Sequence, residues 1–482
     1  MITLNCATGT IVPYVPSAEM PWNRERIKHL YRRMGYGVSS AQIETALEQD
    51  PQDLIDSLID QAINLPLTPE PEWANWNIND YSDFDQQRQE QYVEFLIQWV
   101  RELLQDGFRE KMTLFWHNHF VTELEAYICP SWLYEYRRVL QSNALGNFKT
   151  LTHAIGTTPA MLVYLNGIQS TNIEPNENYA RELYELFTLG QDNGYTQQDI
   201  VETARALTGW NGFVALCAPV GYLSISHDNG QKTIFGQTGN WGYDDVHDIL
   251  FEQRGDQVAT HICTKLYEHF IHPEVDETIV AELAATFKDN NFELEPVLRQ
   301  LFKSEHFFDE AIIGAQIKSP VDFLLTFSNE SSLLQNDEIT EILGYFTFIL
   351  GQQLASPPDV AGWPGNRSWI NSDSLTARWQ ALTQYVYYNF EYAPELLTQF
   401  GQSLAGELNN DPALVTQLII DYLVPNGLNT PEAYDRATEV FKWEVPQNYF
   451  DDGTWNMSWE TVPAQVGLLI GHIVRLPEFQ MY

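Results

Sequence analysis

The sequence is poor in basic residues for its length. Of its 482 residues only 26 are Lys or Arg, against 65 Asp or Glu, so the formal net charge is −39 at pH 7. Sequence-independent nucleic-acid binding and docking on anionic lipid both need a basic surface, and this balance argues against both. The excess of acid is instead typical of a solvated acidic surface, of high-salt surroundings or of cation binding.

Cysteine is also scarce, and its spacing argues against two common kinds of site. The four cysteines are Cys6, Cys129, Cys217 and Cys263, and no two of them form a Cys-x-x-Cys pair. A zinc knuckle or a thioredoxin-type redox site therefore does not fit the sequence. Two disulfides do fit, with three pairings, and the spacing does not choose among them.

Long apolar runs and familiar catalytic signatures are absent too. No apolar run reaches about 18 residues, so no transmembrane helix is expected. The N-terminus lacks a basic region followed by an apolar run, so no signal peptide is visible. The sequence has no Gly-x-Ser-x-Gly elbow, no P-loop and no dinucleotide fingerprint, which argues against serine hydrolases, NTPases and Rossmann enzymes.

The sequence does contain many amphipathic helical patterns. Apolar residues at helical spacing, and capping residues followed by proline, predict helices over most of the chain. They include 87–106, 108–122, 131–142, 148–165, 244–272, 276–289, 294–303 and 461–475, and helices that start at Asn23, Asp50, Ser319, Asp411 and Thr430. Alternating Gly, Thr, Val, Ile and aromatic residues over 211–242, with a turn at residues 227–230, predict a β-hairpin or small sheet.

These patterns predict a mainly α fold with a small β-hairpin or sheet insertion around 211–242. We find no internal repeat and no low-complexity linker. The expected organisation is an irregular N-terminal segment over 1–22 and one large helical domain over 23–482. A soft boundary is expected near 310–320.

A His-x-His motif lies in the predicted helix 108–122, as Phe115-Trp-His-Asn-His-Phe120. At helical spacing His119 falls on the apolar face, and His117 lies well off it. The two histidines therefore do not form a bidentate metal ligand on a helix. His119 is expected to be either a hydrogen-bonded core histidine or a metal-binding or acid–base group.

The densest mixture of charged and apolar residues is the run Asn176-Glu-Asn-Tyr-Ala-Arg-Glu-Leu-Tyr-Glu-Leu-Phe-Thr-Leu-Gly190. On a helix, Glu177, Arg181 and Glu185 share one side, and Glu182 lies beside them. One interpretation is a solvated face on which Arg181 bridges two glutamates. The other is a carboxylate cluster in a cleft, used for metal binding or for general acid–base catalysis.

Basic residues concentrate near the N-terminus. Residues 24–149 hold 12 of the 26, among them Arg32 and Arg33. An acidic chain that gathers cations in one region either pairs them internally or builds an anion-binding pocket.

Six segments, in order along the chain, resemble a known family. They are Arg26-Ile-Lys-His-Leu-Tyr-Arg-Arg-Met-Gly-Tyr-Gly37, Phe115-Trp-His-Asn-His-Phe120, Asn143-Ala-Leu-Gly-Asn-Phe148, the central run with Leu207-Thr-Gly-Trp210, the turn His227-Asp-x-Gly-x-Lys232, and Pro357-Pro-Asp-Val-Ala-Gly-Trp-Pro364. In these motifs the chain resembles the bacterial domain of unknown function 1800 family. The resemblance implies a largely helical, biochemically uncharacterised protein that is exported to the periplasm, the cell surface or the medium. It also implies a sulfatase- or phosphatase-like exported partner. The chain departs from the family in showing no signal peptide.

Two hypotheses follow. The first is an exported hydrolase or transferase, assisted by a divalent metal, that acts on an extracellular or envelope polymer. The second is a non-catalytic surface or assembly protein, in which a structural His/Glu/Arg network joins long helices. The candidate residues are Glu177, Arg181, Glu185 and His119 for catalysis, His117, His119, Glu182, His227 and Asp228 for a metal, and Trp363, Trp369, Arg32 and Arg33 for binding. The enzyme hypothesis requires a histidine of the His-x-His motif, a glutamate of the central run, and His227 or Asp228 in one solvent-reached pocket.

Overall fold

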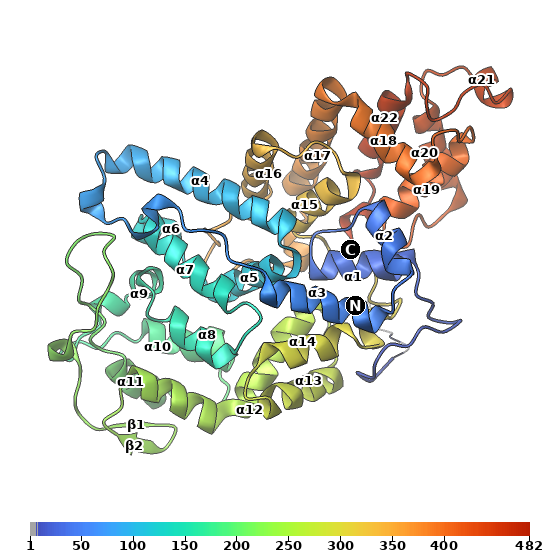
Figure 1. The fold of residues 1–482 in the computed structure, drawn as a ribbon. Coiled ribbons are helices and arrows are strands. Elements are labelled where there is room, and N and C mark those ends of the chain that lie inside the picture. Colours follow the sequence, from blue (N-terminus) through green and yellow to red (C-terminus); the bar gives the residue numbers. More distant parts are fainter. Residues whose placement is uncertain (1–5, 7) are drawn as a thin grey trace.

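The computed structural model describes residue 6 and residues 8–482, which form a mainly α-helical fold (Figure 1). Helices make up 61% of the chain, with 22 α-helices and one two-stranded antiparallel sheet in the described part. The predicted fold class is therefore confirmed. The expected division into domains stays a prediction, and residues 1–5 and 7 of the N-terminal segment lie outside the described part. Among the described residues, no helix combines the length and the apolar character needed to cross a membrane.

Two of the first three helices begin where the sequence predicts them, after Asn23 and Asp50, and the helix between them was not predicted. The three are α1 (Arg24–Met34), α2 (Ser40–Leu47) and α3 (Pro51–Asn64). The side chain of Asn23 accepts a hydrogen bond from the Arg26 amide at 3.0 Å and so caps α1. Asp50 caps α3, and Pro51 occupies the first helical position, where no amide donor is needed.

The next group contains the His-x-His motif. Its helices are α4 (Phe84–Gln105), α5 (Gly107–His119), α6 (Leu124–Tyr127), α7 (Pro130–Ser142), α8 (Phe148–Ile155) and α9 (Pro159–Tyr164). The single helix predicted over 148–165 is two helices, because Pro159 has no amide to continue α8 and starts α9 instead.

The central run and the β insertion follow. The elements are α10 (Asn178–Glu182), a π-helix (Leu183–Thr188), α11 (Gln197–Ala206), β1 (Lys232–Ile234) and β2 (Gln237–Gly239). The hairpin turns at Phe235 and Gly236, both with positive φ, as a tight two-residue hairpin requires. The turn expected at 227–230 is a separate one, in which Asp228 Oδ1 accepts from the Gly230 amide at 2.7 Å.

A disulfide joins the insertion to the helical body. Cys129, directly before α7, is bonded to Cys217, whereas Cys6 and Cys263 are free thiols. The spacing was compatible with two disulfides in any of three pairings. The described part of the chain contains one disulfide, Cys129–Cys217.

The remaining helices form the lower and upper parts of the molecule in Figure 1. They are α12 (Tyr243–Phe270), α13 (Glu277–Asp289), α14 (Leu294–Phe302), α15 (Pro320–Ser331), α16 (Asp337–Ile349), α17 (Ser372–Tyr392), α18 (Pro394–Ala405), α19 (Pro412–Leu423), α20 (Pro431–Lys442), α21 (Gln447–Asp451) and α22 (Val462–Ile473). The apolar helix α22 packs against α17, α18 and α20, which explains why its sequence is apolar nearly all round.

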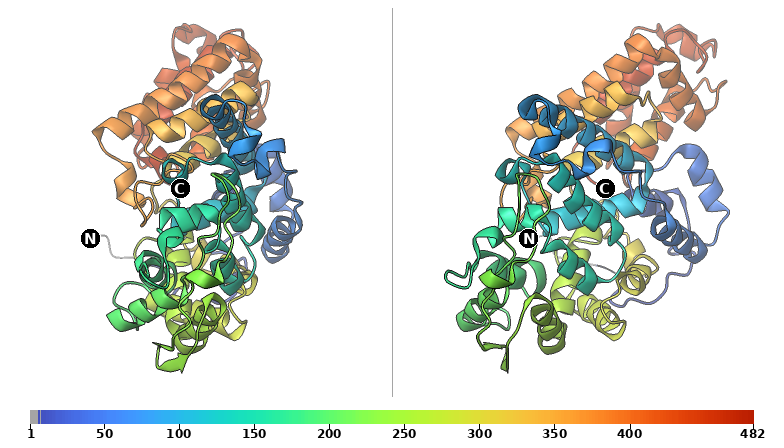
Figure 2. Two further views of the ribbon diagram at one scale, coloured as in Figure 1. Left: turned by 90° about the vertical axis from the view of Figure 1, so that its left-hand side faces the viewer. Right: turned by 60° about the vertical axis from the view of Figure 1, so that its left-hand side comes forward.

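Figure 2 shows the C-terminal helices (orange to red) at one end of the molecule, and the helices from α10 to α14 (green to yellow) at the other. The N-terminal helices (blue to cyan) lie between them. The chain end returns to this middle region, because Ile317 pairs with Met481 and the Tyr482 amide donates to Gln316 O at 2.9 Å.

Candidate functional site

The central acidic run forms an ion-pair network at the surface. On α10 the Arg181 guanidinium bonds Glu177 at 3.1 Å and Glu185 at 3.2 Å. Gln197 donates to Glu177 at 2.8 Å and accepts from Arg181 at 3.1 Å. The side chains of Glu177, Arg181 and Glu185 are 38%, 36% and 23% exposed, so water screens these pairs. Burial and the nearby Glu185 raise the pKa of Glu182, which lies beside them.

The run ends in a π-helix, which its spacing did not predict. The Leu189 amide donates to the carbonyl of Tyr184, five residues back, at 2.9 Å. Turns of this kind are rare and often occur at functional sites. The free carbonyls at the end of this one are bound by two histidines from other helices: His119 Nε2 donates to Phe187 O at 2.9 Å, and His261 Nε2 donates to Leu186 O at 3.1 Å.

Both histidines therefore have the geometry of helix C-caps. Burial, with a smaller effect of His261, lowers the pKa of His119 to about 3. Burial lowers the pKa of His261 to about 4. At neutral pH both rings are uncharged, with Nε2 carrying the proton that the carbonyl accepts.

His117 lies on the other side of α5, in the core. Its Nδ1 is 3.0 Å from the Tyr136 hydroxyl, and its ring packs against the rings of Trp99 and Trp363. Burial lowers the pKa of His117 to about 3. The two histidines of the motif face different surroundings, as expected for a helix, but His117, which was predicted to lie off the apolar face, is the more deeply buried of the two.

His227 and Asp228 belong to a third, separate cluster. His227 Nδ1 donates to the Thr208 carbonyl at 3.0 Å. Asp228 accepts from Arg205 Nε at 2.7 Å, and this bond lowers the pKa of Asp228. Within the described ranges, 6 and 8–482, no group of three or more His, Cys, Asp or Glu side chains could hold a metal ion. The side chains predicted to bind a divalent metal thus do not fit one common site.

The N-terminal cations are held inside the fold. Arg32 forms a buried bidentate pair with Glu330 at 2.6 and 2.8 Å, and both side chains are 2% exposed. Arg33 Nε donates to Phe270 O at 2.9 Å, at the end of α12, and its guanidinium lies 4.4 Å from the ring centre of Tyr482. Arg32 also donates to Tyr422 O and Leu423 O, at the end of α19. Both arginines therefore bond carbonyls at a helix end. Of the two interpretations of this cationic region, internal pairing describes these contacts.

Three of the six motifs, those over 26–37, 115–120 and 357–364, contribute residues to the wall of one cavity. Its volume is about 460 Å³, and it lies between α5, α12, the start of α15, the Gly-Trp-Pro loop and the chain end. The lining side chains include five aromatic residues, four amides and four charged residues: Tyr36, Phe115, Trp363, Trp369 and Tyr482; Asn118, Gln316, Gln352 and Asn366; Lys111, Lys265, Glu268 and Asp322. Trp363 and Trp369, predicted as binding residues, both belong to this wall.

A buried ion pair lies in the wall of this cavity. Lys111 Nζ bonds Asp322 Oδ1, and it also lies 4.3 Å from the ring centre of Tyr36. Burial lowers the pKa of Lys111, although Asp322 opposes this effect. Burial alone would raise the pKa of Asp322, but Lys111 and the Ser319 hydroxyl outweigh it and the pKa is lowered. The ion pair holds the two side chains against each other in the cavity wall.

Unpartnered polar atoms lie beside this pair. The Tyr36 hydroxyl and His269 Nε2 are buried and have no hydrogen-bond partner in the described part of the chain. Burial lowers the pKa of His269 to about 3. Buried polar groups are rarely left unbonded in proteins, so two such atoms beside one ion pair are unusual.

One interaction joins two motifs at the edge of the cavity. Asn118 Oδ1 accepts from the Trp363 amide at 2.6 Å, and Asn118 Nδ2 donates to the Trp363 carbonyl at 3.4 Å. Gly362 has φ +81°, and a Cβ there would lie 2.4 Å from Asn118 O and Oδ1. The loop can approach Asn118 only because this residue is glycine.

The sequence reasoning missed Lys111, Asp322, Tyr36, His269 and Tyr482. Lys111 gave one usable signal, since it stands among the apolar residues Phe108, Met112 and Phe115 of α5. Asp322 gave none, because an acid in the first turn of a helix that follows a Ser cap is ordinary capping chemistry.

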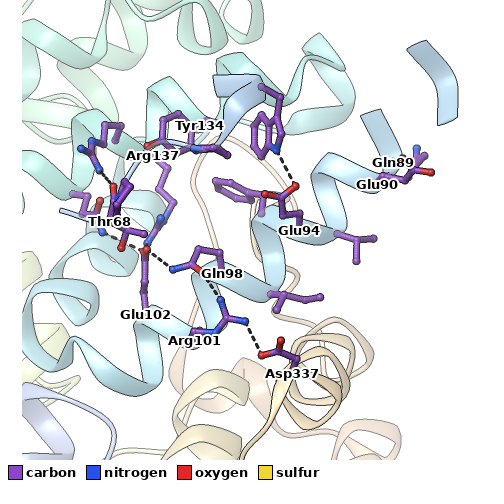
Figure 3. Close-up of a pocket in the computed structure, with 18 residues that line it drawn as sticks. Thr68, Gln89, Glu90, Glu94, Gln98, Arg101, Glu102, Tyr134, Arg137 and Asp337 are labelled. Atoms are coloured by element: carbon purple, nitrogen blue, oxygen red, sulfur yellow. Dashed lines mark hydrogen bonds and ion pairs between the residues drawn. The ribbon is translucent and has the colours of Figure 1, made fainter. Parts of the chain in front are cut away.

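A second, larger cavity of about 780 Å³ lies between α4 and α7 (Figure 3). Its polar groups are largely bonded to one another. Arg137 bonds Glu102 and Glu110, Arg101 bonds Asp337 at 2.7 Å, and Trp73 Nε1 donates to Glu94 at 3.0 Å. These contacts join α4 to α7 and to α16 across the cavity of Figure 3.

Comparison with known proteins agrees with the motifs. The family model described as a protein of unknown function (DUF1800) matches residues 29–481, which is nearly the whole chain. No curated protein and no solved structure matches the chain. The chain therefore belongs to the DUF1800 family of proteins of unknown function.

Proposed function

We propose that this chain is an exported binding protein for a neutral glycan of the envelope or the extracellular space. The glycan would bind in the Lys111–Asp322 cavity, and the charged networks elsewhere would hold the helices together. The exported setting, and a sulfatase- or phosphatase-like partner, rest on the family resemblance. The disulfide agrees with an oxidising compartment.

The observation that carries the proposal is the charge balance of the cavity. Lys111 and Lys265 face Asp322 and Glu268, so a chain of net charge −39 has here a site with equal numbers of cations and anions. His269 adds no charge at neutral pH, because its pKa is about 3. Such a site favours a polar molecule without net charge over an anion or a cation.

The remaining wall suits a molecule rich in hydroxyl groups. Gln316 Nε2 donates to Glu268 O at 2.9 Å, and Gln352 Oε1 accepts from the Val321 amide at 2.9 Å. Each amide is thereby oriented, and the other polar atom of each has no hydrogen-bond partner among the described residues. Aromatic rings such as Trp369 supply flat apolar faces, and a few oriented polar groups on an apolar wall are typical of small-molecule sites.

The pKa values favour binding over catalysis. A general base works best when its pKa is near the working pH, and His269 is far below it. Lys111 is held as an ion pair with Asp322. A hydrolase or transferase acting on the same glycan is the second candidate, favoured by the presence of two carboxylates, Asp322 and Glu268, in one cavity.

A glycan microarray probed with the full chain tests the proposal. Binding to neutral glycans, with weak or no binding to sulfated and uronic-acid glycans, is the expected result. Absence of binding, or a preference for acidic glycans, would overturn it. New reducing ends after incubation with a bound glycan would show that the chain hydrolyses it, and the hydrolase would then be the better assignment.

A further inference from the structure

The loops before and within the β insertion expose aliphatic side chains to an unusual degree. Val214 is 97% exposed, Ile173 is 91% exposed and Ile225 is 85% exposed. Single exposed apolar residues are common, but several that gather in neighbouring loops indicate a surface that contacts another molecule. We call Ile173, Val214 and Ile225 the aliphatic tips.

The tips belong to loops that hydrogen bonds hold together. The Asn172 amide donates to Ser226 O at 2.8 Å, which places residues 172–173 beside 225–226. Gly212 and Gly221 form an antiparallel bridge at the base of the loop that carries Val214. These green loops lie along the left edge of the molecule in Figure 1 and face the viewer in the left view of Figure 2.

The loop that carries Val214 and Ile225 has no charged side chain, whereas Glu174 follows Ile173 in the other loop. No Asp, Glu, Lys or Arg occurs between residues 206 and 227, whereas 19% of the whole chain is charged. Exposed aromatic residues stand near the tips, among them Phe213 and Tyr222. A surface that enters a bilayer must avoid buried charge, and Tyr and Trp prefer the bilayer interface.

The loop is anchored well enough to keep this shape. The Cys129–Cys217 disulfide ties it to the start of α7. The Trp132 indole donates to Ala218 O at 3.1 Å, and the Ile78 amide donates to Leu216 O at 2.9 Å. Rigid protruding tips would need matching pockets in a protein partner, whereas a fluid bilayer accepts them without any.

We propose that the aliphatic tips insert shallowly into the interface of an electrically neutral lipid bilayer, and so hold the protein at a membrane surface. The lipid must be neutral, because anionic lipid repels a chain of net charge −39. The proposal is independent of the glycan-binding cavity, which the aliphatic tips do not line.

Sedimentation of the full chain with phosphatidylcholine vesicles tests it. The wild-type protein should pellet with these vesicles. Mixing in phosphatidylglycerol should weaken binding at low salt, and added salt should restore it. Ile173→Ser, Val214→Ser and Ile225→Ser combined should lower the partition coefficient by about a hundredfold.

The control carries the same number of changes at exposed apolar side chains elsewhere, Leu408→Ser, Tyr345→Ser and Tyr392→Ser. It should bind as the wild type does. Failure of the wild type to pellet, or an equal loss in the control, would overturn the proposal. So would a wild-type dimer that the triple change at the aliphatic tips turns into a monomer, because the tips would then serve self-association. Circular dichroism of both triple variants establishes that they are folded.

Discussion

The side chain of Asn118 holds both backbone polar groups of Trp363, its amide at 2.6 Å and its carbonyl at 3.4 Å. The two residues are 245 positions apart in the chain. This contact joins the His-x-His motif to the Gly-Trp-Pro loop and fixes one wall of the cavity that we assign to ligand binding.

Asn118→Ala should destabilise the protein by about 1–3 kcal/mol, because it leaves the buried backbone of Trp363 without partners. Urea unfolding measures the loss, and limited proteolysis should show faster cleavage within 356–369. Asn429→Ala removes an exposed hydrogen bond to Glu478 and is the control. An equal effect of the two substitutions would contradict the role given to Asn118.

The Lys111–Asp322 pair should behave as a buried ion pair. Lys111→Met or Asp322→Asn alone should cost about 3–5 kcal/mol, since each leaves one buried charge unpaired. The double variant should cost less than the sum, by about 1–3 kcal/mol. Urea unfolding of the four proteins gives this coupling. Additive costs, or costs as small as those of the exposed pair Lys288–Asp256, would count against it.

Stability should fall as the pH drops below about 6.5, the pKa of histidine in an unfolded chain. The folded-state pKa of His119 is about 3, so between these values the unfolded chain binds a proton that the folded chain does not. This contributes a loss of about 1.4 kcal/mol per pH unit as the pH falls.

His119→Gln keeps a donor for Phe187 O and removes the titration. The slope of unfolding free energy against pH should become shallower by about 1.4 kcal/mol per unit between about pH 6 and pH 4. Urea unfolding across this range measures it. An unchanged slope would mean that His119 is not the buried neutral cap described above.

Arg181 should contribute little to the free energy of unfolding. Arg181→Met removes two half-exposed ion pairs, so it should cost less than about 1 kcal/mol and leave glycan binding unchanged. Arg32→Met breaks the buried pair with Glu330 and should cost about 3–5 kcal/mol. Loss of glycan binding in a folded Arg181→Met protein would indicate that the functional site lies in the central run and not in the cavity.

Local signals in the sequence were enough to place most helices. Asn23, Asp50 and Ser319 each carry a capping side chain, followed by an apolar helical pattern, and each caps a helix in the structure. The π-helix was not predictable in this way. Its free carbonyls depend on His119 and His261, which come from two other helices.

The candidate site was less predictable than the fold, because it too depends on contacts between residues far apart in the chain. Trp363 and Trp369 were predicted as binding residues from the Gly-Trp-Pro loop, and both line the cavity. Lys111 and Asp322 are 211 residues apart, and neither residue alone indicates that it meets the other. The dense charge of the central run drew attention to Glu177 and Arg181, although nothing in their spacing distinguishes a half-exposed face from a cleft.

The most direct test is calorimetric titration of the full chain with the neutral glycan selected by the microarray. Three proteins are compared: the wild type, Trp369→Leu, which removes a flat ring from the cavity wall, and Trp443→Leu, a matched change at an exposed tryptophan. We expect the wild type and Trp443→Leu to bind alike, and Trp369→Leu to bind at least about tenfold more weakly. Equal affinity of the three proteins, with Trp369→Leu folded by circular dichroism, would contradict the assignment of the cavity as the glycan site.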